Sequence, residues 1–478
     1  MPTTISGDNQ ITAPLTVGFG ASNVTSNVAV GLSALNANTT GASNTAIGFQ
    51  TLNANTTGVG NVAVGREALY ASTTSNNTAV GFRSLYFNTT GTPNDAFGYQ
   101  ALYNNTTGIS NTAVGYQALL GNTTGTDNVA FGRGSLTSCT IAFQNTAIGR
   151  GTLSANTANN NTAVGAYALQ NNTTGTPNDA FGVNALLANT TGAANVAVGF
   201  EALRFNTTGI YNSAVGFQAL LSNVSGTYNV AVGNGSLSAL GVGSYNTALG
   251  GLALAATTNS NNNIGVGFTA GGSLTTGSDN ICIGVNAGVS GVGLTTGSSN
   301  VLVGHSARTS IAGAVSQIVI GANNVGQGNN FVSIGGGGTN YIYAQFNSSA
   351  TWTKASDERI KQNIQDTPIG LDFIDKLRVV TYNWKPSNEI PEDIIGYAEE
   401  NTQDLETTMY GFVAQEVKEA MDELGYNNFT GWNIREADGL QGIATDQFVL
   451  PLINAVKELK AELDAVKAEL ATIKQGAA

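Results

Sequence analysis

The chain has 478 residues and a formal net charge of −12, enough for two or three ordinary domains. The charge is uneven: residues 1–350 carry seven acids and six arginines, whereas residues 351–478 carry 23 acids and 12 bases. No region is strongly basic, so a nucleic-acid groove is not expected. With only His305, Cys139 and Cys282 as soft ligands, we expect no metal and no cofactor, and we interpret both cysteines as small buried residues.

The first segment, residues 1–15, has neither the basic region nor the apolar region of a secretory signal, so none is expected. No run of about 20 apolar residues is present, so we expect no membrane insertion. We interpret this segment as an attachment point for other proteins.

One motif, Asn-x-Ala-apolar-Gly, recurs through the first part of the chain. Its glycines are 17 residues apart, except for two steps of 16 and one late insertion of three residues. A full unit, starting at Asn111, reads NTAVGYQALLGNTTGTD. The motif glycines are Gly31, Gly48, Gly65, Gly81, Gly98, Gly115, Gly132, Gly149, Gly165, Gly182, Gly199, Gly216, Gly233, Gly250, Gly267, Gly284, Gly304 and Gly321.

Each unit combines an extended stretch with turn residues, and 17 residues are too few for a domain. They suffice for one turn of a β-solenoid in which each turn packs on the next, and 18 such turns would build a rod of roughly 85 Å. The motif resembles the head repeats of trimeric autotransporter adhesins over residues 16–335. That resemblance implies three β-rolls side by side, although units in that family run nearer fourteen residues.

Several functions of the rod surface are open at this stage. Each Asn-Thr-Thr-Gly turn is formally a glycosylation sequon, but the same residues form a good turn. Stacked threonines are typical of ice-binding ladders, and equally of a solvated turn face. Calcium binding is set aside because acids seldom recur at the turns. Some aromatic residues near the turns could touch a glycan or pack on the next unit: Tyr86, Phe87, Tyr103, Phe205 and Tyr211.

Beyond the rod the composition changes. Residues 341–346 alternate like a strand, 369–377 have helical spacing, 379–384 predict a strand, and 410–424 open apolar and continue as an amphipathic helix. The last helix repeats apolar residues at steps of four and three, which is typical of a short coiled coil. Its seam residues are Leu452, Val456, Leu459, Leu463, Val466, Leu470 and Ile473.

The motifs SDERIK, GLDFIDKLRVVTYNW, YGFVAQEV and LPLINAVKELKAEL occur in that order over residues 355 to about 475. They closely resemble the peptidase S74 domain, the intramolecular chaperone at the C-terminus of phage tail spikes and fibres. The resemblance implies a domain that trimerises, assists folding of a β-rich stalk and cuts itself away. It places the nucleophile at Ser356, the general base at Lys361 and the cleavage site at Ser356 and Asp357. Residues 414–416, AQE, are interpreted as structural.

The chemistry of the pair agrees with these roles. A serine hydroxyl needs a base, and a lysine can serve when burial or a neighbouring cation, such as Arg359, keeps it neutral. The alternative for Ser356 and Asp357 is an ordinary helix N-terminus. Residues 386–409 match no motif and are interpreted as a variable insertion.

We therefore predict a mostly β protein: a trimeric β-solenoid followed by a small α+β chaperone domain that ends in a coiled-coil helix. The predicted parts are an attachment segment (1–15), the rod (16–335), a β-rich connector (336–355), the self-processing chaperone (356–451) and the coiled coil (452–475).

The predicted function is a homotrimeric phage tail fibre that binds a host-surface receptor, expected to be a glycan. The fibre would join other tail or baseplate proteins through its N-terminus. It would be made in the host cytoplasm and reside in the virion, with one self-cleavage and no turnover enzyme in the rod. A bacterial surface adhesin or filament is the alternative, disfavoured by the missing secretory signal. A glycan-cleaving spike is ranked lower because paired carboxylates are few.

Overall fold

The computed structural model describes residues 17–337, 341–345, 349–353, 358, 361–392, 394, 397, 399–401, 405–434 and 439–476. The chain divides into two compact units, Met1–Ala355 and Ser356–Ala478, which are treated separately below. The predicted attachment segment, residues 1–15, lies outside the described residues.

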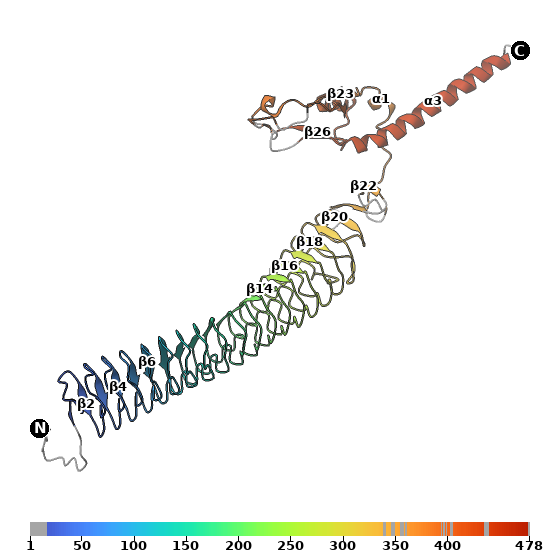
Figure 1. Cartoon of the computed structure of the whole chain (residues 1–478). Coiled ribbons are helices and arrows are strands. Elements are labelled where there is room, and N and C mark those ends of the chain that lie inside the picture. Colours follow the sequence, from blue (N-terminus) through green and yellow to red (C-terminus); the bar gives the residue numbers. More distant parts are fainter. Residues whose placement is uncertain are drawn as a thin grey trace. The chain divides into compact units, whose positions relative to one another are not determined.

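The first unit is a β-solenoid, as the repeat predicts. Strands β2 to β19 lie parallel, each paired with the next along the chain, and they stack along the rod (Figure 1). We call one turn of the solenoid a rung. The strands are β2 (Val28–Val30), β3 (Thr45–Ile47), β4 (Val62–Val64), β5 (Thr78–Val80), β6 (Asn94–Phe97), β7 (Asn111–Val114), β8 (Val129–Phe131), β9 (Thr146–Ile148), β10 (Asn161–Val164), β11 (Asn178–Phe181), β12 (Asn195–Val198), β13 (Ser213–Val215), β14 (Val230–Val232), β15 (Thr247–Leu249), β16 (Ile264–Val266), β17 (Ile281–Ile283), β18 (Val301–Val303) and β19 (Ile318–Ile320).

The strand register follows the predicted steps. The motif alanines pair along the stack, so Ala113 of β7 lies beside Ala130 of β8. The 16-residue steps occur where the sequence predicts them; at the first of them Ala63 pairs with Ala79. The three-residue insertion falls between β17 and β18, where Cys282 pairs with Leu302.

The rod core consists of columns of small and medium side chains. In the rung that begins at Asn111, the buried apolar residues are Ala113, Ala118 and Leu119. Equivalent residues of neighbouring rungs lie above and below them in one continuous core. Because each rung buries its apolar face on the next, packing couples neighbours only.

Two further columns of buried asparagines run through the rod. In the first, the Asn195 side-chain amide donates to Asn178 Oδ1 at 3.1 Å, and Asn195 Oδ1 accepts from the Asn212 backbone N–H at 3.0 Å. The second column is formed by the asparagines of the Asn-Thr-Thr-Gly turns. There, Asn122 Nδ2 donates to Asn105 Oδ1 at 2.7 Å and to the Gly125 carbonyl at 3.1 Å.

This second column decides between a glycosylation site and a turn. The bond from Asn122 to Gly125 confirms that the motif forms a turn, and the asparagine lies inside the rod rather than in solvent. A buried, hydrogen-bonded amide is not accessible for glycosylation. The first threonine of the turn, Thr123, donates its hydroxyl to the Thr140 carbonyl of the next rung. Both turn residues therefore join rungs together.

The turn column is interrupted where the next rung lacks an asparagine. Among the described residues, Asn55, Asn122 and Asn223 each have a buried Oδ1 with no hydrogen-bond donor. The residues that follow them in the column are Ser72, Cys139 and Leu240. Since the missing donor is the side-chain amide of the next rung, each interruption leaves one unsatisfied acceptor.

Both cysteines are free and buried, as predicted. Cys139 replaces an asparagine of the turn column, whereas Cys282 replaces an alanine of the strand column. Burial raises the pKa of the Cys139 thiol to about 11 and that of the Cys282 thiol to about 12. Both thiols are therefore protonated and unreactive at neutral pH.

The motif glycines allow the rungs to approach. Gly115 has a φ of +135°, and a Cβ there would lie 2.7 Å from the Gly132 carbonyl carbon of the next rung. Both the backbone conformation and the short spacing exclude a side chain.

Antiparallel strands close both ends of the described stack. β1 (Val17–Gly18) pairs with β2, and β20 (Phe331–Gly335) follows β19 in parallel before pairing with β21. β21 (Tyr341–Gln345) is the strand predicted at 341–346, and it pairs with β22 (Ser349–Thr353).

The second unit is α+β. The helix predicted at 369–377 is a single turn, because the chain becomes extended again at β23. The predicted strand at 379–384 and the predicted coiled-coil helix are present as β23 and α3. The elements are α1 (Leu371–Ile374), β23 (Val380–Tyr382), η2 (Ser387–Glu389), β24 (Met409–Gly411), α2 (Ala414–Leu424), β25 (Trp432–Ile434), β26 (Gln441–Ile443), η3 (Thr445–Phe448) and α3 (Val449–Gly476).

In the part of the chain that the structure describes, no helix combines the length and apolar character needed to cross a membrane. Within the same residues, no group of three histidines, cysteines or acids is arranged to hold a metal ion.

Candidate functional site

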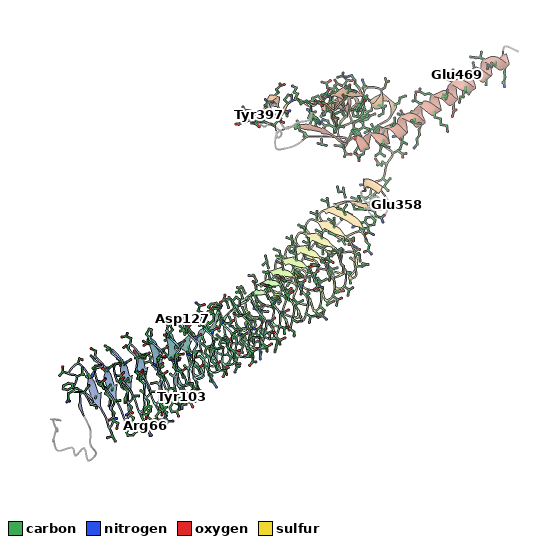
Figure 2. The ribbon with its side chains drawn as sticks, in the orientation of Figure 1. Arg66, Tyr103, Asp127, Glu358, Tyr397 and Glu469 are labelled. Atoms are coloured by element: carbon green, nitrogen blue, oxygen red, sulfur yellow. The ribbon has the colours of Figure 1, made fainter. Side chains whose placement is uncertain are left out.

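The predicted catalytic segment lies where the second unit begins. The boundary between the two units falls between Ala355 and Ser356. Ser356 and Asp357 lie outside the described residues, so their geometry with Lys361 stays a prediction. Lys361 is described: its backbone N–H donates to the Glu358 carbonyl at 3.0 Å, and its side chain is exposed (Figure 2 labels Glu358).

This exposure bears on the predicted role of Lys361. In the predicted role the lysine amine must be neutral to take a proton from serine, which burial or a neighbouring cation would favour. The Lys361 side chain is exposed in the single chain, so the predicted role calls for a further event that buries it. Arg359, the predicted neighbouring cation, lies outside the described residues.

A compact aromatic core supports the segment that follows Lys361. Phe373 of α1 is fully buried, 5.3 Å from Phe429 and 6.0 Å from Tyr426 between ring centroids, both edge-on. Phe448 stacks on the same ring at 6.2 Å, and Met421 of α2 completes the cluster. Edge-on and stacked ring pairs have preferred orientations in addition to the apolar area that they bury. The core therefore fixes α1 relative to α2 and η3.

The AQE motif begins α2 and has a structural partner. Glu416 accepts hydrogen bonds from the guanidinium of Arg378, one of them at 3.0 Å. The Arg378 hydrogen bonds hold the pKa of the Glu416 carboxyl below its ordinary value. Both side chains are partly or largely exposed, so the pair orients α2 against the start of β23 more than it stabilises the fold.

The base of α3 is tied to the same region. Asn454 Nδ2 donates to the carbonyls of Thr367 and Ile369, each at 3.1 Å. The Leu371 N–H donates to Glu458 Oε2 at 2.7 Å. These contacts connect the first turns of the terminal helix to the chain just beyond Lys361.

Asn454 and Glu458 were not predicted from the sequence. They lie on the polar flanks of the heptad pattern, where Asn and Glu are expected to face solvent, so no local signal distinguishes them. Their role depends on residues almost ninety positions earlier in the chain, which pattern analysis cannot pair.

The part of α3 beyond Ala455 is exposed, although Glu458 within it accepts the hydrogen bond from Leu371. Every residue from Val456 to Gln475 is exposed. Leu452, which lies before this range, is exposed as well, so all seven predicted seam residues are open to solvent. Seam side chains such as Leu459 and Val466 are 49% and 59% exposed. An apolar stripe at heptad spacing on an otherwise charged helix is the pattern of a coiled-coil strand.

Comparison with known families gives one match. Residues 356–426 match the family model described as Peptidase_S74, chaperone of endosialidase. The match begins at the predicted nucleophile, includes Lys361 and the AQE motif, and stops before β25 and α3. No curated protein and no solved structure matches the chain.

This match confirms the resemblance predicted from the motifs. The family implies a self-cleaving domain of peptidase type. A β-solenoid followed by such a region fits a tail fibre or tail spike with a C-terminal chaperone domain.

Proposed function

We propose that the chain is a homotrimeric phage tail fibre or receptor-binding protein, made in the host cytoplasm and carried on the virion. Its C-terminal unit brings three chains together and then releases itself by one cut next to Ser356. The rod contacts a host-surface receptor, a glycan in this proposal, and residues 1–15 attach to other tail or baseplate proteins. The match at residues 356–426 supports the chaperone part of this proposal.

The observation that carries assembly is the exposed seam of α3. Seven apolar side chains spaced by four and three residues are open to solvent in a single chain. Two further copies of the helix would bury them, and burial of apolar area is the principal driving force for association. The contacts at Asn454 and Glu458 then fix each helix to its own globular core.

The rod surface supports side-by-side packing of three chains. The residue before each motif glycine points outward from its strand, and many of these side chains are large, apolar and exposed. A stripe of this length on a soluble protein indicates an interaction surface. Its exposed members are Ile47, Phe97, Phe131, Ile148, Phe181, Val198, Val215, Val232, Leu249, Ile283 and Ile320.

Such a stripe also explains why a chaperone is needed. The rungs of the rod are nearly interchangeable, so three rods shifted by one rung relative to one another would bury almost the same types of residue. A domain that gathers the chains first would remove this ambiguity. Cleavage after assembly would make the correct register hard to lose and hard to form again, because the rod without its C-terminal unit could not repeat the assembly step.

The proposed cleavage uses the Ser356 hydroxyl oxygen as nucleophile against the carbonyl of an adjacent peptide bond. Lys361 takes the hydroxyl proton as the bond to carbon forms, and returns a proton to the leaving nitrogen when the peptide bond breaks. The ester that this leaves on Ser356 is then hydrolysed by water, which separates the two fragments. Assembly buries Lys361, which makes the amine neutral and couples the cut to trimer formation.

The test is expression of the full chain and two single variants. Wild-type protein should give a rod fragment and a small C-terminal fragment on a denaturing gel, while Ser356→Ala and Lys361→Ala should stay uncut. Lys385→Ala, which removes an unrelated lysine from the same unit, is the matched control and should be cut normally. Normal cleavage of either site variant would refute the dyad.

A further inference from the structure

One column of side chains on the rod differs from the others because it contains both arginines and aromatic rings at successive rungs. It consists of the residues that directly follow the motif glycines from Gly48 to Gly149, and we call it the arginine–aromatic column. The Arg66 guanidinium lies 5.5 Å from the Phe49 ring centroid and 5.9 Å from that of Phe82. The members are Phe49, Arg66, Phe82, Tyr99, Tyr116, Arg133 and Arg150.

The stack continues through tyrosines to a second cationic end. The rings of Phe82, Tyr99 and Tyr116 stack in turn, with centroids 5.1 Å apart at both steps. The Arg133 guanidinium follows at 5.5 Å from the Tyr116 centroid. Tyr99 and Tyr116 are 43% and 47% exposed, so the column is open to solvent.

The two cationic ends differ in their charge balance. At the first, Glu67 pairs with both Arg66, at 3.0 Å, and Arg83. Burial alone would raise the pKa of the Glu67 carboxyl, but hydrogen bonds from Arg83 and Arg66 hold it below its ordinary value, so the carboxylate is charged. One carboxylate therefore offsets one of the two arginine charges of this cluster within the rod.

At the second end the charges are not neutralised. Arg133 and Arg150 lie on adjacent rungs, joined by the bond from the Gly151 N–H to the Arg133 carbonyl at 3.0 Å. Both side chains are exposed, and within the described residues neither forms an ion pair. Asp127, close in sequence, lies along the opposite edge of the rod from Arg66 (Figure 2). Two like charges one rung apart repel each other and favour a bound anion.

Beside these arginines the next column has no side chain of its own at two successive rungs. Gly134 and Gly151 follow the two arginines, with Gln117 in the rung before and Tyr167 in the rung after. A Cβ at Gly134 would meet only Thr137 Oγ1 at 3.5 Å, which is ordinary contact. We call this gap the glycine notch.

The backbone does not explain the notch. Gly134 and Gly151 have φ values of +66° and +64°, a conformation that favours glycine. Yet the same column holds Gln117 at +54°, Tyr167 at +62° and other non-glycine residues at similar values. Since the rod tolerates side chains at this position elsewhere, the effect specific to Gly134 is open space, whereas at Gly151 the Tyr167 ring of the next rung occupies the space beside the backbone.

Tyr167 forms the far wall of the notch. The Arg150 guanidinium lies 5.4 Å from the Tyr167 ring centroid, and a Cβ at Gly151 would lie 3.0 Å from that ring. The notch thus directly follows Arg133 and Arg150 in the chain, and the Arg150 guanidinium lies against the ring that bounds it. Guanidinium groups bind carboxylate, sulfate and phosphate in a fork geometry, and aromatic rings pack against the apolar faces of sugars.

We infer that Arg133, Arg150 and the glycine notch form a binding site for the acidic group of a saccharide, with Tyr116 and Tyr167 contacting its sugar rings. The inference rests on the proposed function, because it names the receptor class of the same rod. Burial of two unpaired guanidinium groups between rods would carry a large desolvation penalty, so this edge stays at the surface of the proposed trimer.

The test uses self-processed wild-type protein and three soluble probes in titration calorimetry: polygalacturonate, dextran sulfate and neutral dextran. Wild type should bind one or both acidic polymers and not neutral dextran, with affinity that falls as salt is added. Carboxylated and sulfated receptors are distinguished by which acidic polymer binds. Arg133→Gln with Arg150→Gln should weaken that binding by about tenfold or more.

A second variant tests the notch without changing charge. Gly134→Gln introduces the residue that Gln117 provides one rung earlier, so the rung should fold while the notch is filled. Gly235→Gln is the control in the same column, beside Asn234 rather than arginine; a Cβ there would lie 2.9 Å from Leu252 Cδ2, so the end of that side chain must shift. We expect weaker binding for the first variant and unchanged binding for the second.

Three outcomes would overturn the inference: no binding of either acidic polymer, equal binding of a single-stranded oligonucleotide, or wild-type affinity in the double arginine variant. Failure here is distinguishable from failure of the proposed function. A chain that cuts itself, trimerises and adsorbs to cells but ignores acidic saccharides refutes only the inference. A chain that stays uncut and monomeric refutes the proposed function.

Discussion

The rod and the C-terminal unit both expose apolar side chains, but they differ in how well one chain completes its own structure. Each rod rung is paired on both sides by the same chain through strands, asparagine columns and a continuous core. In the C-terminal unit the core ends near Ala455, and the rest of α3 projects with its seam in solvent. Charge follows the same division, with a balance of −1 over residues 1–350 and −11 over 351–478.

The difference teaches that stability and register have separate sources. The rod is stable by repetition, and repetition is what makes its register between chains ambiguous. The C-terminal unit has one short seam fixed to one core, so three copies of α3 can associate in few alternative registers. In the proposed function the second region supplies the register that the first lacks, and then leaves.

The largest effect is expected from breaking the seam. Leu459→Asp with Leu463→Asp places two charges on the proposed three-helix interface, where each costs more than the short seam can offset. We expect chains that aggregate or stay monomeric and uncut, measured by light scattering and a denaturing gel. Lys460→Gln with Glu462→Gln alters the flanks only and should assemble normally. Normal trimers from the aspartate variant would mean that residues 356–451 organise assembly without α3.

Deletions in the rod should separate whole rungs from broken ones. Removal of residues 195–211 takes out one complete 17-residue unit, so β11 can pair with β13 and a shorter rod should fold. Removal of residues 195–203 instead brings unmatched columns together and should lower the cooperativity of thermal unfolding. Circular dichroism melting checks both. Equal melting of the two deletion variants would contradict a structure built from nearest-neighbour contacts.

A smaller effect is expected inside one rung. Asn195→Leu removes the side-chain bonds to Asn178 and Gly209 and leaves the buried Asn212 N–H without its acceptor. We expect a loss of about 3 kcal/mol in the free energy of unfolding. Val196→Thr, on the outward face of the same strand, should change it by less than about 0.5 kcal/mol. Denaturant titration of both variants measures the difference, and equal values would argue against the asparagine column.

The smallest expected effect is an increase in the stability of the rod. Cys139→Asn should supply the donor that Asn122 Oδ1 lacks and continue the column, raising the free energy of unfolding by about 1 kcal/mol. The same substitution at Cys282 would bury an amide in the alanine column, where no partner exists in the described core, and should destabilise the rod. If Cys139→Asn destabilises as much as Cys282→Asn, the two columns do not differ as the structure indicates.

The rod was predictable because its signal is repeated. A single Asn-x-Ala-apolar-Gly motif predicts little, but its recurrence at a constant spacing predicts one extended stretch per unit and a stacked arrangement. The buried position of the turn asparagines was not predictable, since Asn-Thr-Thr-Gly has the composition of a solvent-facing turn. Only the stacking of Asn105 on Asn122 shows that the amide pairs with its equivalent in the next rung.

The C-terminal unit was predictable in a different way. Motif resemblance located its start and the AQE helix, and heptad spacing located α3. The extent of α1 was not predictable, because Leu371, Ile374 and Leu377 have helical spacing while only the first two lie in the helix. Tertiary contacts from Asn454 and Glu458 fix that segment instead. The arginine–aromatic column escaped the sequence analysis because its members are separated by whole rungs and become neighbours only when the solenoid forms.

The central claim is that three chains assemble through the C-terminal unit and remain together after it is lost. Multi-angle light scattering of the self-processed rod, purified away from the C-terminal fragment, tests it most directly. The account predicts the mass of three rods, stable on dilution, and slow or failed recovery of that mass after denaturation. A mass of one rod for the cleaved product would contradict it.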